Sequence, residues 1–171
     1  VDAFADYHIN ERYSPASSSP GFMQSQFADR KLHDTVYVTA NPHIHDLSGG
    51  IFHDVCSLYR TDWNEQFKTV LPETVVEAAM KAYEEYPQKR LIIHFMQPHY
   101  PFLGQTGKQI PGGISPKDES RDEYPHPWNN QMWGDKQDRE LLIQAYRENH
   151  AIAATHAERL VQSLSGQSVV T

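Results

Sequence analysis

The sequence predicts an α/β fold in which helices flank a mainly parallel sheet. Strand-like and helix-like patterns alternate along its 171 residues, and such crossovers build parallel sheets. Two apolar or β-branched runs, residues 35–40 and 91–97, each end within two residues of a proline, which cannot donate to a sheet ladder. An apolar stripe at helical spacing lies between them. We therefore expect a single, partial α/β domain over residues 1–171.

Two short patterns precede the middle of the chain. Small hydroxyl residues ahead of Pro20 and Gly21 favour the start of a helix. The run 35–40 has strong β propensity and indicates a buried strand. Residues 42–70 hold Gly49-Gly50 and aromatic residues, and we expect this stretch to be irregular.

The middle helix is expected to begin at Pro72, because proline is tolerated in a first turn, and to end at Pro87. Glu73 complements the positive end of the helix dipole. The apolar residues recur at i, i+3, i+4 and i+7, so one stripe should face the sheet. This stripe consists of Val76, Ala79, Met80 and Tyr83.

The second half contains a strand over residues 91–97, a long excursion, a long helix and a final strand. Residues 104–134 are rich in Gly and Pro and also hold tryptophans, which favours an ordered, functional loop. A helix is expected from about Asp138 to Leu164, capped by Gly166, with a strand from Ser168. The apolar face of this helix should comprise Leu142, Ala145, Tyr146, Ile152, Ala153, Leu160 and Val161.

Composition argues against several classes of protein. The net charge of -7 and the lack of a Lys/Arg-rich patch argue against nucleic-acid binding. No apolar run is long enough to span a bilayer. Cys56 is the only cysteine, so neither an internal disulfide nor a cysteine metal cluster can form, and its apolar neighbours indicate a small buried side chain.

Residues that could carry chemistry gather where the expected strands end, and in open α/β sheets ligands bind beyond the carboxyl ends of strands. His99 and Tyr100 follow the run 91–97 between two prolines, either as site residues or as part of an ordinary proline-rich turn. His43 and His45 follow the first run; they either bind a metal from one side of an extended segment or are polar surface. His94, inside a strand, is expected to be a hydrogen-bonded core residue.

Two further candidates lie near the start of the chain. Asp2 is either a ligand for a divalent cation or a solvated charge. The Ser-rich segment 14–20 either places a hydroxyl at a helix N-terminus, where backbone N–H groups favour an anion, or supplies a plain N-cap.

Together these segments resemble the sulfatase-like enzymes of the alkaline phosphatase superfamily. Val1-Asp2-Ala3 followed by Asp6-Tyr7 looks like the first metal-binding segment, and the Ser-rich segment 14–20 resembles the nucleophile region. Residues 37–42, Tyr-Val-Thr-Ala-Asn-Pro, resemble the second strand of prokaryotic members. Residues 98–102, Pro-His-Tyr-Pro-Phe, are similar to the Pro-His-x-Pro-Phe segment. Residues 166–171 look like the strand before the family's Asp-His-Gly metal motif.

The resemblance implies an incomplete alkaline-phosphatase-like fold and metal-dependent hydrolysis or transfer of sulfate or phosphate esters, small-molecule or glycan. Asp2 would bind a divalent ion, whether Ca, Mn, Mg or Zn. Ser18, two positions before a proline, would be the nucleophile, with Ser19 as the alternative. His99 would contact the sulfuryl or phosphoryl oxygens or the leaving group. The further expected substrate contacts are Tyr100 and Asn41.

The sequence departs from the family in three places. Phe4-Ala5 stands where the family has an arginine after the first aspartate. No Cys-x-Pro-x-Arg sequence occurs, which disfavours a formylglycine arylsulfatase and favours an unmodified serine. The Asp-His-Gly motif and a further histidine of the metal site are absent from the 171 residues. We therefore expect the chain to be part of a longer protein and to have little activity alone.

A second hypothesis comes from a different class. The chain would be a non-catalytic α/β carbohydrate-binding or interaction module, complete in itself, with aromatic side chains stacking on sugars. The side chains expected to be exposed for this purpose are Trp63, Trp128 and Trp133.

Overall fold

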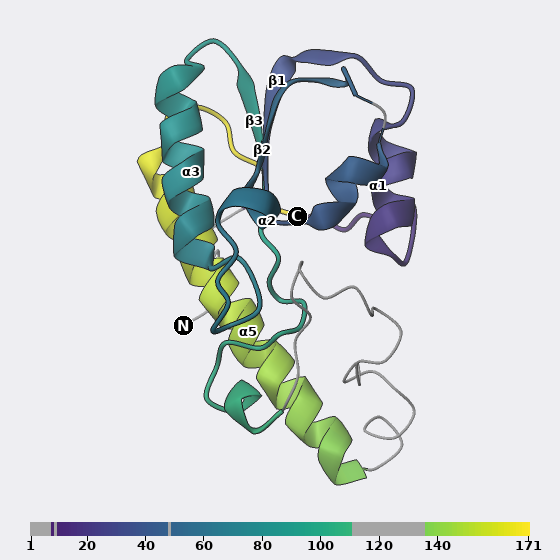
Figure 1. The fold of residues 1–171 in the computed structure, drawn as a ribbon, viewed down its shortest axis with the longest axis vertical. Helices are drawn as coiled ribbons and strands as arrows, with labels where there is room; N and C mark the ends of the chain where they lie inside the picture. Colours follow the sequence, from purple (N-terminus) through teal and green to yellow (C-terminus); the bar gives the residue numbers. More distant parts are fainter. Residues whose placement is uncertain (1–7, 9, 48, 111–135) are drawn as a thin grey trace.

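The computed structural model describes residues 8, 10–47, 49–110 and 136–171. Strands β1 (Leu32–Thr39), β2 (Phe52–Ser57) and β3 (Arg90–His94) form a parallel sheet in the order β2-β1-β3. Helices α3 (Pro72–Glu85) and α5 (Lys136–Ser163) lie on one side of this sheet (Figure 1). Helix α1 (Ser19–Phe27) and the 3-10 helix η1 (Pro42–Asp46) lie on the other. The described residues thus form a small mixed α/β fold.

Strand β1 is the centre of the core because both of its faces are covered. Successive strand side chains point to opposite faces. Val36 and Val38 pack into one cluster together with residues of α3 such as Val75, whereas Tyr37 packs on the other face against Met23 of α1. All of these side chains are buried. A strand covered on both faces explains the continuous β-branched run in the sequence.

All three strands are parallel, so their carboxyl ends share one edge of the sheet. In the register, Thr39 of β1 lies between Ser57 of β2 and His94 of β3. The short helix α2 (Leu58–Thr61) follows β2 directly at this edge, below the sheet in Figure 1. The structure therefore gathers, as expected, the segments that follow the strands.

The two long helices form where the sequence indicates. The buried stripe of α3 differs from the one expected, whereas in α5 the expected Leu142, Ala145, Ala153 and Leu160 are buried. In α3 the fully buried positions are Pro72, Val75, Ala79 and Ala82, so the expected stripe is rotated and only Ala79 is common to both. In α5 the expected Tyr146 is 40% exposed, and the polar Asn149 is fully buried instead. Helix α5 packs on α3 and also on η2 (Gly107–Gln109).

Three expectations about strands need correction. β2 lies inside the stretch expected to be irregular; it is an edge strand with exposed His53 and Asp54, so it shows no apolar run. β3 ends at His94, three residues before Gln97. Residues 168–171 form no strand, and Val169 is 80% exposed. Most of the expected loop 104–134 lies outside the described residues.

The aromatic residues also differ from expectation in one described case. Trp63 is half-buried, packs against the cluster around Val36 and Val38, and meets the ring of Tyr59 edge-on at a centroid distance of 5.3 Å. It is therefore a packing residue and not an open stacking platform. Trp128 and Trp133 lie outside the described residues.

Candidate functional site at the carboxyl edge of the sheet

Asn41 lies immediately beyond the carboxyl end of β1, at the start of η1. Its side-chain oxygen accepts the backbone N–H of His43 at 2.9 Å, and its own N–H donates to the Thr39 hydroxyl at 3.0 Å. The residue is only 4% exposed. Asn41 therefore occupies the expected edge, with its amide oxygen committed to capping η1.

His43 and His45 lie in a 3-10 helix rather than in an extended segment. Residues two apart in such a helix point in different directions, because there are three residues per turn. His45 instead joins its Nε2 to the hydroxyl of Ser57 at 3.0 Å and so ties η1 to the end of β2. The expectation that the two imidazoles share one side of an extended strand was wrong.

The described residues contain no group of three or more His, Cys, Asp or Glu side chains arranged to hold a metal ion. Asp2, the expected ligand, lies outside the described residues. The part of the edge that the structure describes thus supplies imidazole, amide and hydroxyl groups but does not by itself fit a divalent ion.

His94 is a core histidine, as expected. Its Nδ1 lies 2.7 Å from the hydroxyl of Tyr37, and the two rings stack with an interplanar angle of 11°. Burial lowers the pKa of His94, because the charged imidazolium loses its hydration, and burial raises the pKa of Tyr37 for the corresponding reason. The pair holds β3 against β1 in neutral form.

The segment that follows β3 carries His99 on residues 98–103, which we call the His99 loop. The His99 side chain is exposed, and its Nδ1 lies 2.5 Å from the backbone oxygen of Tyr100. A carbonyl only accepts, so Nδ1 carries the hydrogen in this contact. The contact fixes the ring relative to the loop that bears it.

Tyr100 lies on the inner side of the same loop. It is 6% exposed and packs in a cluster with Phe102 and with Leu142 and Ala145 of α5. Burial raises the pKa of the Tyr100 hydroxyl to about 12. The Tyr100 ring thus anchors the loop to α5 and is not exposed to solvent.

Two consecutive residues of α5 hold this loop and the segment just after it by polar contacts. The side-chain oxygen of Asn149 accepts the backbone N–H of Leu103 at 2.8 Å, and its NH2 group faces three carbonyl oxygens of the loop. Glu148 accepts from the backbone N–H and from the hydroxyl of Thr106 at 2.9 and 2.5 Å. These hydrogen bonds lower the pKa of Glu148. Sequence analysis missed both residues, although a polar residue on the apolar stripe of α5 was a visible signal.

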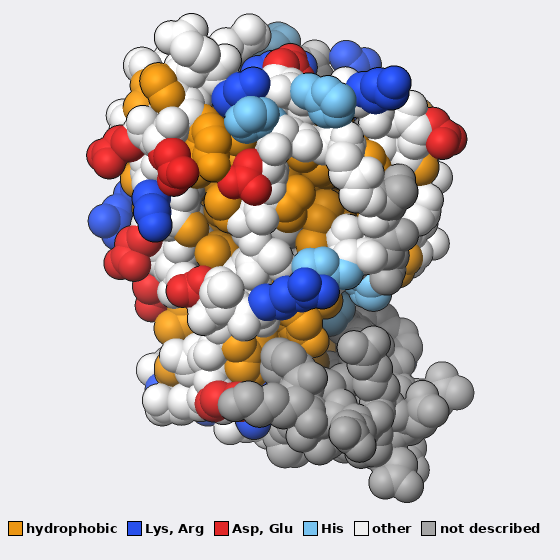
Figure 2. All heavy atoms as spheres, turned by 45° about the horizontal axis from the view of Figure 1, so that its top comes forward, with side chains coloured by type: hydrophobic (Ala, Val, Ile, Leu, Met, Phe, Trp, Pro, Cys, Tyr) orange, Lys and Arg blue, Asp and Glu red, His pale blue; other side chains and the backbone are white. Residues whose placement is uncertain are grey.

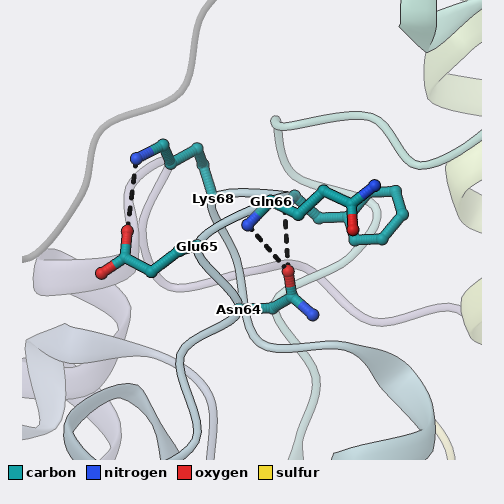
Figure 3. A network of polar contacts seen from close by, with 5 residues as sticks. Asn64, Glu65, Gln66 and Lys68 are labelled. Carbon is teal, nitrogen blue, oxygen red and sulfur yellow. Dashed lines mark hydrogen bonds and ion pairs between the residues drawn. The ribbon is translucent and has the colours of Figure 1, made fainter.

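Gln97 connects the start of the His99 loop to a turn on another part of the edge. Its buried NH2 group donates to the hydroxyl of Thr69 and to the carbonyl of Val70 at 3.3 and 3.1 Å. Its Oε1 has no hydrogen-bond partner among the described residues. The turn before Thr69 has contacts of its own: Asn64 accepts two backbone N–H groups, and Lys68 pairs with Glu65 at 3.2 Å (Figure 3).

Ser18 is the N-cap of α1, which confirms the helix start expected there. Its hydroxyl is exposed and accepts the backbone N–H of Gly21 at 3.4 Å. Helix α1 packs against η1, the segment that follows β1. Asn41 thus closely follows β1, whereas His99 lies on the segment after β3 and its neighbour Tyr100 packs against α5. Ser18 stands on α1 with its hydroxyl directed to its own helix.

A hollow of about 460 Å³ lies between η2 and the first turns of α5. Its lining includes the carboxylates Asp138 and Glu140. Negative side chains repel an anionic ester, so we do not assign substrate to this hollow. On the face drawn in Figure 2, hydrophobic side chains show in the centre, and acidic, basic and histidine side chains lie around them.

Comparison with protein-family models, with curated proteins and with solved structures found no match for this chain. In the part of the chain that the structure describes, no helix has the length and apolar character needed to cross a membrane.

Proposed function

We propose that this chain belongs to a metal-dependent hydrolase or transferase that acts on sulfate or phosphate esters through a serine nucleophile. The substrate would be a small-molecule or glycan ester, and the 171 residues alone would have little activity. One observation carries the proposal: an exposed imidazole, His99, lies on a loop beyond the carboxyl edge of a parallel sheet, and buried contacts from α5 fix that loop.

The proposed chemistry needs an activated hydroxyl and compensation for anionic oxygens. Ser18 would lose its hydroxyl proton to solvent and attack sulfur or phosphorus, so that an Oγ–S or Oγ–P bond forms while the bond to the ester oxygen breaks. Water or an acceptor alcohol would then displace the serine and regenerate it. His99 would donate a hydrogen bond to a non-bridging or leaving oxygen, where negative charge develops. A divalent ion bound through Asp2 would lower the pKa of the serine hydroxyl and neutralise charge.

The position of Ser18 supports this role. It stands at the start of α1, a helix of nine residues. The first backbone N–H groups of a helix lack intrahelical partners and favour a nearby anion. Such a terminus would stabilise both an attacking alkoxide and the equatorial oxygens of the ester. A plain N-cap needs the same geometry, so only chemistry distinguishes the two roles.

The test replaces the nucleophile without removing the cap. In the intact protein, Ser18→Asn keeps an N-cap side chain, and Ser18→Ala removes both functions. We expect each variant to lose turnover of aryl sulfate or aryl phosphate esters by at least about a thousandfold, as serine removal does in other hydrolases. Chelation by EDTA should abolish turnover, and one of Ca, Mn, Mg or Zn should restore it.

Neighbouring serines provide the controls. Ser17→Ala alters an exposed hydroxyl one residue away and should leave turnover unchanged. Ser19→Ala tests the alternative nucleophile. Full turnover in both Ser18 variants and in EDTA would remove the mechanism. In the part of the chain that the structure describes, Trp63 packs against the core cluster, which does not favour the carbohydrate-binding alternative.

A further inference from the structure

Asn149 lies in the middle of α5 and is fully buried, at 0% exposure. It faces the His99 loop. Its NH2 group lies 3.3 Å from the carbonyl oxygen of Pro98, 2.9 Å from that of His99 and 3.2 Å from that of Pro101. Its side-chain oxygen accepts the N–H of Leu103 at 2.8 Å. One amide therefore contacts the backbone on both sides of the exposed imidazole.

This arrangement is specific rather than generic packing. Asn149 occupies a buried position in line with Ala145 and Ala153, where an apolar side chain would fill space at no polar cost. Burying a primary amide is unfavourable unless its donors and acceptor are matched. Here every hydrogen-bonding group is matched, and the two N–H hydrogens are shared among three carbonyls. The two prolines of the loop lack N–H groups, so the backbone has few other means to hold this shape.

The same helix supports the loop from a second direction. Tyr100 is buried in the cluster that α5 builds from Leu142 and Ala145. The backbone oxygen of Tyr100 in turn lies against the His99 ring at 2.5 Å. The position of the imidazole thus depends on α5 through one polar and one apolar contact. Of the two, only Asn149 contacts the carbonyl of His99 itself.

We propose that Asn149 is a positioning residue that holds the His99 imidazole in its working geometry beyond the carboxyl edge of the sheet. The inference rests on the proposed function, because it deepens the role given there to His99. Misplacing a catalytic group by about 1 Å can cost about a hundredfold in rate. The amide of Asn149 restrains the backbone on which that group stands.

The activity test is a double-mutant cycle in the intact protein. Asn149→Ala should lower kcat/KM for an aryl ester by about tenfold to a hundredfold. In a His99→Ala background the same change should cost less than about twofold, because residues that act through one another are not additive. A merely structural residue would cost as much in both backgrounds, and that result would overturn the proposal. Asn149→Ser keeps one donor and serves if the alanine variant folds poorly.

Asn64→Ala is the matched control. Asn64 is also an asparagine that accepts backbone N–H groups of a neighbouring loop, but that loop is the 64–68 turn drawn in Figure 3. Its replacement should leave kcat/KM within about twofold, because the 64–68 turn is tied to the chain ahead of the His99 loop through Gln97 and not to the backbone around His99. A loss equal to that of Asn149→Ala would mean that general loosening explains both, which contradicts the positioning role.

A spectroscopic readout separates this inference from the proposed function. Asn149→Ala should shift the NMR resonances of the His99 ring and speed hydrogen exchange of the Leu103 amide, while the His94 ring resonances stay in place. If these changes occur but the wild-type intact protein turns over no ester, the proposed function is wrong, whereas the restraint of the His99 loop by Asn149 is confirmed. If His99 is required for turnover but neither its resonances nor the cycle responds to Asn149, the positioning role fails.

Discussion

The pair formed by Tyr37 and His94 shows how one buried contact links stability to pH. Each residue comes from a different strand, and the hydroxyl lies 2.7 Å from the imidazole nitrogen. Burial lowers the pKa of His94 below its ordinary value of 6.5. The unfolded chain therefore binds a proton at this residue at a higher pH than the folded chain does. Stability rises with pH wherever the unfolded state holds more protons, so the contribution of neutral His94 is lost as pH falls.

The variant His94→Gln removes this titration and retains a side-chain amide that can donate a hydrogen bond to the Tyr37 hydroxyl or accept one from it. We expect the wild type to lose more unfolding free energy than the variant when pH falls from about 7.5 to about 5.5, below the unfolded pKa of histidine. Urea denaturation at the two pH values measures the difference. Equal losses in both proteins would show that His94 is not protonated more readily in the unfolded chain.

Residue-level predictions from sequence succeeded where the signal was local and failed where it was not. Ser18 stands two positions before a Pro-Gly pair, and this pattern alone indicates the cap that the structure shows. Asn149 meets a loop about fifty residues earlier in the chain, and no local rule predicts such a pairing. The same holds for His45 and Ser57, whose contact depends on the parallel pairing of β1 with β2.

Among the elements, the segment between β3 and α5 is shaped by close backbone approach. A side chain at Gly107 would come within 3.0 Å of the backbone carbonyl and Cβ of Phe102, closer than real Cβ atoms come. A side chain at Gly104 would collide with Glu148 in the same way. These glycines let the His99 loop and η2 fold tightly against α5.

Gly107→Ala should therefore destabilise the protein by about 1–3 kcal/mol, the usual cost of overpacking. Gly49→Ala is the matched control, because nothing lies within 4 Å of the position that its new methyl group would take. The control should change the unfolding free energy by less than about 0.5 kcal/mol. Urea denaturation of the two variants measures both changes in unfolding free energy. Equal changes would contradict the packing argument.

Elements with a strong periodic signal were predictable, and those that depend on tertiary partners were not. β1, α3 and α5 follow from an uninterrupted β-branched run and from apolar residues at helical spacing. β2 carries exposed His53 and Asp54 at the sheet edge, so its strand character comes from pairing with β1 and not from its own pattern. The run from Ser168 has strand propensity, but no described strand pairs with it.

For the whole molecule, the position of β1 predicts a gradient of local stability. Over residues 35–39 this strand lies between β2 and β3 and is buried on both faces. Its amide hydrogens should open only on global unfolding, whereas those of residues 167–171 should exchange fastest. Hydrogen exchange followed by mass spectrometry checks this order. Protection of residues 167–171 equal to that of β1 would mean that the segment pairs with the sheet in solution.

The parallel topology also has a consequence for how quickly the native state is reached. No two described strands are joined by a tight hairpin, and the pairing of β1 with β3 sets residue 36 opposite residue 91. Closing so long a stretch of chain costs conformational entropy before the strand pairing contributes any favourable free energy. Refolding should thus be slow and should pass through intermediates that aggregate. The yield of native protein should therefore rise at low protein concentration or with chaperones.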